Sequence, residues 1–401
     1  MPGIASRIAG FSFIPLGLLS SPGWSGWPLA LGYFLAIFLG QGVAVVLALR
    51  TPSLHAKDAG MPRSPVRLSI VIPAKDEAQD LALVLDDLRH QELPGTVSTE
   101  VIVVHAPSSD GTEEVARKHP SVTKAIAEPP LPPGWVGKNW ACDRGYRSAS
   151  GDVLLFLDAD VRLSPEALRA ALSELEQRHV DLVTFGARVV MQSFWENVVL
   201  PLYTQFVLTY FMPHRSNRPG SRRAIANGQF LMVTRARYER IGGHERIRNY
   251  VLEDVKLAQE VKRSGGTIRF VWTPEMVTTR MYRDRKEMFE GLSKNVHGTE
   301  FRATRQVALL VGVVLLFLSP IVVLGMGLAY LSLPWTLVSL LAIFVTLLKQ
   351  AAFQRSLQAP LRYAFTYPLG VVFYVAMLWR SLVRGVRGRG VTWKGRTYPT
   401  P

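Results

Sequence analysis

The segment Val153-Leu-Leu-Phe-Leu-Asp158-Ala-Asp160 decides the fold class of this 401-residue chain. Its five leading apolar residues are typical of a strand that is buried on both faces, and its two carboxylates follow where that strand leaves the core. Ser164, Pro165 and Glu166 then predict a helix start, with a capping hydroxyl, a proline at the first helical position and an acid in the first turn. We expect a strand, a turn and a helix that runs to Arg178.

The same alternation of strand and helix occurs twice upstream. The predicted strands are 68–73 and 100–105, and the helices that follow them contain Leu81, Leu85 and Leu88 at helical spacing, and residues 112–119. Alternating strands and helices predict an open α/β sheet that is mostly parallel. Ligands bind beyond the carboxyl ends of the strands in such sheets, which here are residues 73–77, 105–112 and 158–160.

Long apolar runs flank this α/β region. Residues 28–49 are long enough to span a membrane, and residues 306–348 contain no charged residue in 43 positions, about twice the length of one span. We expect two spans there, joined by a turn near residues 332–334. Residues 363–379 form either a thin span or an interfacial segment. The shorter run 8–20, interrupted by Pro15, has no clear cleavage site, and we keep it in the mature chain rather than interpret it as a signal peptide.

The distribution of charge identifies a membrane partner rather than nucleic acid. The net charge is +15, but residues 68–305 hold 32 Lys and Arg against 30 Asp and Glu, so +13 of the charge lies in the flanks. Basic clusters that border apolar runs are typical of cytoplasmic anchors. We therefore predict a multi-pass protein of the cell membrane with a cytoplasmic catalytic domain. A basic tail on the same side requires one C-terminal run to be re-entrant or interfacial.

These patterns divide the chain into four parts. Cys142 is the only cysteine, so no intrachain disulfide and no multi-cysteine metal site can form. The predicted parts are an N-terminal membrane anchor (1–49), a cytoplasmic catalytic domain with interfacial helices (50–305), a C-terminal membrane region (306–380) and a basic tail (381–401).

Three groups of residues have the chemistry of a site. Asp158 and Asp160 can supply oxygen ligands to a hard divalent cation that also grips a diphosphate, although the same pattern fits a solvated turn. Glu253-Asp254 opens a helix, where the acids either complement the positive helix end or provide a carboxylate base. Lys138, between Trp135 and Trp140, lies near a helix start. This position is suited to phosphate binding, but the same residues would also fit a packing loop with a solvated lysine.

Several motifs occur in an order and spacing that resemble inverting glycosyltransferase family 2 enzymes with a GT-A fold. They cover about residues 68–300 and comprise Val-Ile-Pro73-Ala-Lys-Asp-Glu77, Ser109-Asp110-Gly111-Thr112, Leu-Asp158-Ala-Asp160, Asn227-Gly228-Gln229-Phe230, Gly242-Gly243-His244 and Glu253-Asp254-Val-Lys-Leu-Ala. Further motifs are similar to a membrane-bound branch that glycosylates hydrophobic lipids such as carotenoids and hopanoids: Pro-Pro-Gly-Trp135-Val-Gly-Lys138-Asn-Trp140, Arg280-Met-Tyr282 and Gly291-Leu-Ser-Lys294-Asn295.

The resemblance implies a role for each matching residue. The fold would be a GT-A (nucleotide-diphospho-sugar transferase) open mixed sheet with flanking transmembrane helices. The catalytic pair would be Asp254, the general base, and its neighbour Glu253. The implied donor-binding residues are Pro73, Ala74, Glu77, His105, Asp110, Lys138 and Asp158, and the implied ligands of Mn2+ or Mg2+ are Asp160 and Asp158.

Two departures from the family pattern bear on the substrates. Family members carry one or two aspartates where this chain has His105 and Ala106, which puts the common uridine preference in question, although a UDP-sugar stays one candidate donor. The chain also lacks the Gln-x-x-Arg-Trp motif of processive cellulose-synthase-like enzymes. The expected activity is therefore single transfer rather than polymerisation.

The predicted reaction is an inverting, metal-dependent transfer of a sugar from a nucleotide sugar to a membrane lipid of carotenoid or hopanoid type. The alternatives are transfer to a polyprenyl phosphate, a glycerolipid or a sphingolipid, and a non-catalytic membrane scaffold. Residues 194–212 are expected either to lie in the interface beside the site or to form a buried core helix. Residues 282–294 are expected to dock on headgroups, and the basic segment 214–223 is interpreted as a mobile loop that either closes over the diphosphate or faces anionic lipid.

Overall fold

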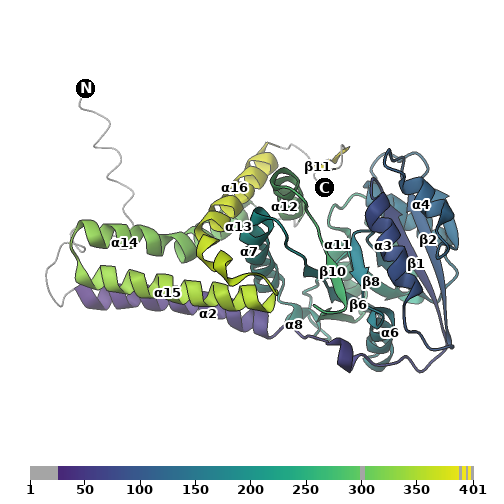
Figure 1. Ribbon diagram of the computed structural model, residues 1–401, viewed down its shortest axis with the longest axis horizontal. Coiled ribbons are helices and arrows are strands. Elements are labelled where there is room, and N and C mark those ends of the chain that lie inside the picture. The colour runs from purple at the N-terminus through teal and green to yellow at the C-terminus, as the bar shows by residue number, and fades with distance from the viewer. Residues whose placement is uncertain (1–25, 299–302, 388–390, 394–395, 399–401) are drawn as a thin grey trace.

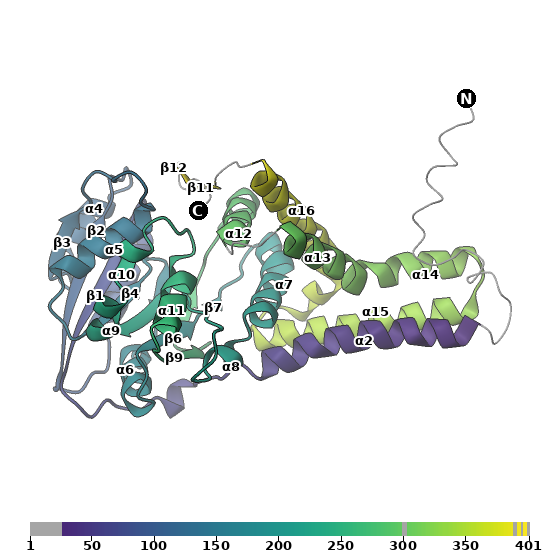
Figure 2. The same cartoon turned by 180° about the vertical axis from the view of Figure 1, so that it is seen from behind.

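The chain folds into a sheet-containing domain from which a bundle of long helices projects (Figure 1). The computed structural model describes residues 26–298, 303–387, 391–393 and 396–398. The predictions for residues 8–20 and for most of the basic tail lie outside these described residues. Seen from behind, the sheet and the bundle again occupy opposite ends of the molecule (Figure 2).

The domain is organised around a seven-stranded mixed sheet. Its strands in spatial order are β3 (Lys124–Ala127), β2 (Val97–His105), β1 (Val66–Ala74), β4 (Val153–Leu157), β8 (Phe230–Thr234), β6 (Leu182–Gly186) and β9 (Ile268–Trp272). Only β8 runs antiparallel to its neighbours β4 and β6 in this sheet, and the other pairs are parallel. The predicted open, mostly parallel α/β sheet is therefore confirmed.

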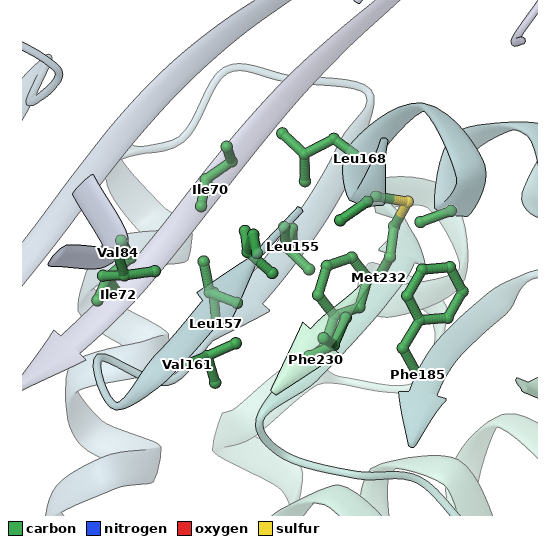
Figure 3. Packing of buried hydrophobic residues seen from close by; sticks show 14 of the residues in the cluster. Ile70, Ile72, Val84, Leu155, Leu157, Val161, Leu168, Phe185, Phe230 and Met232 are labelled. Carbon is green, nitrogen blue, oxygen red and sulfur yellow. The ribbon is translucent and has the colours of Figure 1, made fainter. Parts of the chain in front are cut away.

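Both faces of the sheet are covered, because alternate residues of each strand point to opposite sides. Ile70 and Leu155 face one side, where they pack with Leu168 and Met232 (Figure 3). The domain helices that cover the sheet or border it are α3 (Ala78–Arg89), α4 (Thr112–Lys118), α5 (Gly137–Ser148), α6 (Ala167–Gln177), α9 (Arg235–Arg240), α10 (Gly243–Arg246) and α11 (Glu253–Arg263). A short 3-10 turn, η3 (Ala56–Asp58), precedes β1. Two-faced burial explains why the central strands are continuous apolar runs.

A second, three-stranded sheet extends the domain beside the main one. It contains β5 (Val161–Leu163), β10 (Val277–Thr279) and β7 (Arg188–Val189), in that order. A short hairpin near the C-terminus pairs β11 (Val391–Trp393) with β12 (Arg396–Tyr398).

The predicted start of α6 is wrong by three residues. Ser164 and Pro165 form a turn, and the helix begins at Ala167. The hydroxyl of Ser164 donates to Glu166 over 2.7 Å, whereas the side chain of Gln91 accepts from the N–H of Leu168 over 3.1 Å. A residue far away in the sequence thus supplies the cap that the local pattern assigned to Ser164.

Four helical segments are long and apolar enough to cross a membrane, by length and composition. They are α2 (Trp27–Leu49), the run of α13 (Ala303–Val313), the π-helical η4 (Val314–Leu318) and α14 (Ser319–Ala329), then α15 (Leu333–Ser356), and finally η5 (Leu361–Thr366) with α16 (Tyr367–Val386). The turn expected near residues 332–334 lies between α14 and α15. Both views show α2, α14 and α15 side by side, with α16 at an angle to them near the domain (Figures 1 and 2).

Helices α7 (Phe194–Phe211), α8 (Pro213–Ser216) and α12 (Arg285–Gly298) lie at the junction of the domain and the bundle. Ser193 and Glu196 form a capping box that sets the start of α7. The headgroup-docking prediction for residues 282–294 is wrong for their apolar side chains. Met288 and Leu292 are fully buried in one cluster with residues of α7 and α16, because this face of α12 packs inside the protein.

Candidate active site

A cavity of about 400 Å³ opens at the carboxyl ends of β1 and β4. One part of its lining is polar and includes Lys75, Glu77, Lys138, Asp158, Asp160, Glu253, Asp254 and Lys294. The other part is mainly apolar and is lined by Leu200, Tyr203, Val207, Leu208, Phe211, Ile225, Phe270, Trp272 and Met281. The cavity therefore joins a charged compartment to a hydrophobic one.

Lys138 links two carboxylates that come from different elements. Its Nζ lies 2.7 Å from Oδ1 of Asp158, just beyond β4, and 2.8 Å from Oε1 of Glu253, at the start of α11. Burial acts to lower the pKa of Lys138, but Asp158 and Glu253 outweigh it and raise that pKa well above its usual value. Lys138 is therefore a permanent cation at the centre of the polar compartment.

Glu253 and Asp254 have different environments although they are consecutive residues. Burial acts to raise the pKa of Glu253, but the adjacent Lys138 ammonium offsets this and the net shift is downward. Burial and the charge of Glu253 instead raise the pKa of Asp254 to about 7. Glu253 stays ionised at neutral pH, whereas Asp254 exchanges its proton there.

Gly228 holds the Asp254 carboxylate in place. The N–H of Gly228 donates to Oδ2 of Asp254 over 2.7 Å, and the N–H of Val255 donates to Oδ1 over 2.7 Å. A Cβ atom on Gly228 would lie 2.9 Å from Oε1 of Glu253 and 3.0 Å from Nζ of Lys138. Only a glycine at this position lets the loop before β8 approach the charged groups so closely. The sequence motif included Gly228 without indicating this contact, which depends on the meeting of β8 and α11.

Aromatic and amide contacts hold the start of α5, which contains Lys138, and the loop before it in place. The rings of Trp135 and Trp140 meet edge to face at 5.0 Å, and the indole N–H of Trp140 donates to the carbonyl of Pro129. The amide of Asn139 donates to the carbonyls of Ile247, Arg248 and Tyr250, in the segment that leads to Glu253. Asn139 thus ties the helix that positions Lys138 to the approach of α11.

Eight of the ten predicted site residues line this cavity. They are Pro73, Ala74, Glu77, Lys138, Asp158, Asp160, Glu253 and Asp254. Oδ2 of Asp160 also accepts a hydrogen bond from the Thr279 hydroxyl over 3.3 Å. The structure thus brings the predicted donor, metal and catalytic residues together at one place.

The remaining predicted residues, His105 and Asp110, do not line the cavity. The His105 side chain is buried. Because every second residue of β2 points to the same side, His105 faces the same way as Val103, toward α3 and α4. The neighbouring Ala106 lines the cavity instead. Asp110 accepts hydrogen bonds from the N–H of Ala78 and from Thr112. Its carboxylate therefore organises the loops before α3 and α4.

Lys294 and three neighbours in the lining were not predicted from the sequence to belong to the site. Burial lowers the pKa of Lys294, which projects from α12, to about 8. The amide of Asn295 donates to the hydroxyl of Tyr203 over 3.1 Å, next to Tyr282. These residues separate the polar compartment from the apolar one. A motif had included Lys294 and Asn295, but their approach to α7 required the folded chain.

One face of α7 forms a wall of the apolar compartment. Leu200, Tyr203, Thr204, Val207, Leu208 and Phe211 line it with helical spacing. The other face packs on the membrane-type helices: the Phe206 ring stacks on Tyr374 of α16 with centroids 4.3 Å apart. A Cβ on Gly370 of α16 would lie 2.5 Å from the carbonyl oxygen of Val198, so the two helices are in close contact. Helix α7 thus stands between the apolar compartment and the bundle.

Two carboxylates in the cavity are available as ligands for a divalent metal. Among the described residues there is no group of three or more His, Cys, Asp and Glu side chains that could hold an ion. Asp158 and Asp160 flank Ala159 at the cavity wall, and both offer the hard oxygen ligands that Mg2+ and Mn2+ accept. Since such ions commonly take their other ligands from substrate phosphates and water, the residues present fit a metal bound together with a diphosphate.

The basic segment 214–223 is anchored on one side rather than a free loop. Asn217 exchanges two hydrogen bonds with the backbone of Phe270 in β9, of 2.8 and 2.7 Å, and Nζ of Lys262 donates to the carbonyl of Arg218. None of its arginines is among the residues that line the cavity. Closure of this segment over a bound diphosphate stays a prediction.

Comparisons with known proteins agree with this site. Residues 69–242 match the family model described as "Glycosyl transferase family 2". The chain is 23% identical over 338 residues to 4,4'-diaponeurosporenoate glycosyltransferase of Staphylococcus aureus (strain USA300), covering 82% of this chain and 88% of that protein. It is 27% identical over 233 residues to the enzyme of the same name from Staphylococcus haemolyticus (strain JCSC1435), covering 57% of this chain and 60% of that protein's length.

A solved structure extends the likeness to the fold. The mannosyltransferase of Pyrobaculum calidifontis in complex with GDP-Man and Mn2+ superposes with a TM-score of 0.50 at 16% identity, covering 89% of this chain and 99% of that one. The domain therefore has the expected GT-A fold. Taken with the cavity at the strand ends, these matches identify the chain as a glycosyltransferase with a family 2 domain over residues 69–242.

Proposed function

We propose that the protein transfers a sugar, with inversion, from a nucleotide sugar to a hydrophobic lipid of carotenoid or hopanoid type. The observation that carries the proposal is the cavity in which a charged compartment and an apolar compartment meet beside Asp254. The names of the two staphylococcal relatives, which specify a carotenoid-type acceptor, support the lipid class.

The polar compartment is the proposed donor site. Pro73, Ala74 and Glu77 lie at the end of β1, where nucleotides bind in open α/β sheets. Lys138 would meet the diphosphate from the start of α5, since a helix N-terminus and an ammonium both favour an anion. Its Nζ already lies 2.7 Å from Asp158, so the donor would share this cation with that carboxylate.

Asp160 and Asp158 are the proposed ligands of a divalent cation. The solved mannosyltransferase with the same fold contains Mn2+, which supports a metal here. When bound, such an ion would neutralise charge that develops on the leaving diphosphate. Both carboxylates lie in the lining at the end of β4, within the compartment proposed for that diphosphate.

Asp254 is the proposed general base. In a single in-line displacement, the acceptor oxygen forms a bond to the anomeric carbon while the bond to the diphosphate oxygen breaks. The acceptor proton passes to the Asp254 carboxylate, and the nucleoside diphosphate leaves with the electron pair. A base is most effective when its pKa lies near the working pH, and the pKa of Asp254 is about 7.

The apolar compartment is the proposed acceptor site. One face of α7 lines it and another face packs on α16, so α7 alone separates it from the bundle, the side from which a lipid would enter. An apolar wall with few polar groups suits a hydrocarbon acceptor with one reactive end.

One observation favours the alternative acceptor, a polyprenyl phosphate. Lys294 lies in the lining near the carboxylates of the site, and an ammonium there would complement a lipid phosphate. Comparing a neutral carotenoid or hopanoid alcohol with a polyprenyl phosphate in the same assay separates the two acceptors.

We also propose that α2, the continuous run of α13, η4 and α14, and α15 each span the membrane and that α16 is the interfacial run. The ends of α2 and α15 near the domain carry Arg50 and Arg355, whereas the far turn of residues 330–332 has no charge. Basic residues favour the cytoplasmic side. This arrangement places the catalytic domain and the basic tail in the cytoplasm.

Nucleoside-diphosphate release by detergent-purified protein tests the reaction. The assay uses a panel of UDP- and GDP-sugars, a mixed lipid extract, and either Mn2+, Mg2+ or a chelator. We expect release with one donor that is lost with chelator and in Asp160→Ala, but kept in the control Asp152→Ala, whose exposed side chain pairs with Arg67 on the surface. Donor binding without release under every condition would favour a non-catalytic scaffold.

A further inference from the structure

Exposed arginines from three distant segments gather where the bundle meets the domain. Arg50 ends α2, Arg215, Arg218 and Arg223 belong to the segment after α7, and Arg305 lies in the first turn of α13. We call these five residues the arginine patch. Arg50 directly follows the candidate span Trp27–Leu49, and Arg305 is the second residue of the candidate span Thr304–Ala329, so the patch lies at the level where a bilayer surface would be.

Contacts between the segments bring these arginines close together in space. Helix α2 packs on α7, and Nη1 of Arg223 donates to the carbonyl oxygen of Tyr210, in the last turn of α7, over 3.4 Å. The pKa of His214 is lowered by burial and by the positive charges of Arg215, Arg50, Arg218 and Arg223. The positive charges of Arg305 and Arg223 both act on Tyr210, in the last turn of α7. The patch is therefore one electrostatic unit rather than a set of separate residues.

The patch lacks anionic partners inside the protein. In the described part of the chain, no ion pair involves any of its five arginines, whereas most arginines elsewhere on the domain pair with Asp or Glu. Like charges that are held together repel one another unless an external anion binds. None of the five arginines is among the residues that line the cavity, where the donor diphosphate is proposed to bind.

We propose that the arginine patch binds the phosphate headgroups of anionic phospholipids on the domain side of the bilayer. This inference rests on the membrane placement proposed above but not on the identity of the sugar or the acceptor. Positively charged side chains bind phosphate, and several of them beside a membrane surface select anionic over zwitterionic lipid. By anchoring the segment after α7, bound headgroups would hold the mouth of the apolar compartment against the membrane.

The test measures lipids retained by the full-length protein in nanodiscs of equal parts phosphatidylcholine and phosphatidylglycerol, by native mass spectrometry after detergent release. The variant is Arg215→Gln, Arg218→Gln, Arg223→Gln. The matched control, Arg89→Gln, Arg240→Gln, Arg246→Gln, removes three exposed arginines of α3, α9 and α10 that form no ion pair in the described part of the chain. These helices lie far from the bundle (α3 in Figure 1, α9 and α10 in Figure 2). A third protein carries lysine at 215, 218 and 223.

We expect the patch variant to retain about tenfold less phosphatidylglycerol, with phosphatidylcholine unchanged, while the control and the lysine variant behave as wild type. Equal retention in the patch variant and the control would overturn the proposal. Two further results would also overturn it: displacement of the lipid by inorganic phosphate, which indicates a site for soluble anions, and a parallel loss of donor affinity, which indicates a donor site. Extraction of all variants from membranes by carbonate would instead refute the membrane placement.

Discussion

Glu253 and Asp254 are adjacent in sequence, yet only Glu253 contacts the ammonium of Lys138, at 2.8 Å, while Asp254 accepts hydrogen bonds from the N–H groups of Gly228 and Val255. The ion pair keeps Glu253 charged, and this charge raises the pKa of Asp254. In the proposed mechanism the two carboxylates therefore have different roles: Glu253 provides electrostatic support and Asp254 accepts the proton.

Replacing Asp254 by asparagine should lower the transfer rate by about a hundredfold to ten-thousandfold, because the amide cannot accept the acceptor proton. Donor affinity should change little. Glycoside formation and donor binding measured on the same preparation check this prediction. Transfer at near wild-type rate would remove Asp254 from the mechanism.

The pH dependence should report the charges around Asp254. Activity should rise with pH through about 7, since the base must be deprotonated. Glu253→Gln removes a charge that raises the pKa of Asp254, so the rise should move to lower pH. Lys138→Met removes a charge that lowers the pKa, so the rise should move to higher pH. Profiles of kcat/KM for the two variants that move in the same direction would contradict this electrostatic account.

The raised pKa of Asp254 also predicts a pH-dependent stability. The folded state binds a proton at this carboxyl more tightly than the unfolded state, so the folded protein loses stability as pH rises from about 4 to about 7. Asp254→Asn should therefore raise the unfolding temperature at pH 8 and have no such effect near pH 4. Thermal unfolding in detergent across this range measures the difference. A stabilisation that does not vary with pH would have another cause.

Gly228→Ala should reduce kcat by about tenfold to a hundredfold, because the added methyl group would displace the carboxylates and Lys138 by a few tenths of an ångström or more. The matched control is Gly95→Ala, whose added Cβ meets no atom within 4 Å. Steady-state kinetics of the two proteins makes the comparison. Equal rates would show that the close approach of Gly228 is unimportant for activity.

Phe211→Ala should raise the KM for the lipid acceptor by about tenfold while leaving the KM for the donor unchanged, since only the apolar wall loses area. Phe344→Ala, which truncates a ring 56% exposed on α15, is the control. A rise in the donor KM instead would assign this compartment to the sugar nucleotide.

Engineered cysteines can test the proposed topology. The native Cys142 is only 1% exposed, so it should not react with the labelling reagent. Leu331→Cys, in the far turn, should react with an impermeant maleimide in intact cells, whereas Val386→Cys, at the end of α16, should react only after permeabilisation. These side chains are 92% and 74% exposed, so lack of reaction reflects the membrane rather than burial. Labelling of residue 386 in intact cells would make α16 a span.

The sequence was sufficient to predict features that depend on local pattern. The strand 153–157 has the predicted bounds because five consecutive apolar residues have no other place than a doubly covered sheet. The eight predicted residues in the cavity come from strand ends and helix starts, which open α/β topology brings to one edge. The order of the motifs and the positions of the apolar runs were therefore enough to predict most of the fold and most residues of the polar compartment.

Features that depend on contacts between distant segments were not predictable. Gln91 caps α6, and the N–H of Gly228 holds the carboxylate of Asp254. At the boundary of the two compartments, the amide of Asn295 donates a hydrogen bond to the hydroxyl of Tyr203. The place of His105 was missed for a simpler reason: the family motif indicates a position near the nucleotide, but alternation along β2 turns the side chain to the opposite face.

The shared use of α7 restricts how this protein can evolve. Each residue inserted into an α-helix turns everything beyond it by about 100°. One insertion after Ser193, where the capping box sets the start of α7, would turn the cavity-lining side chains of α7 out of the cavity and the ring of Phe206 away from Tyr374. Related proteins should therefore change the chemistry of this wall by substitution, with the number of residues between Ser193 and Phe211 kept constant.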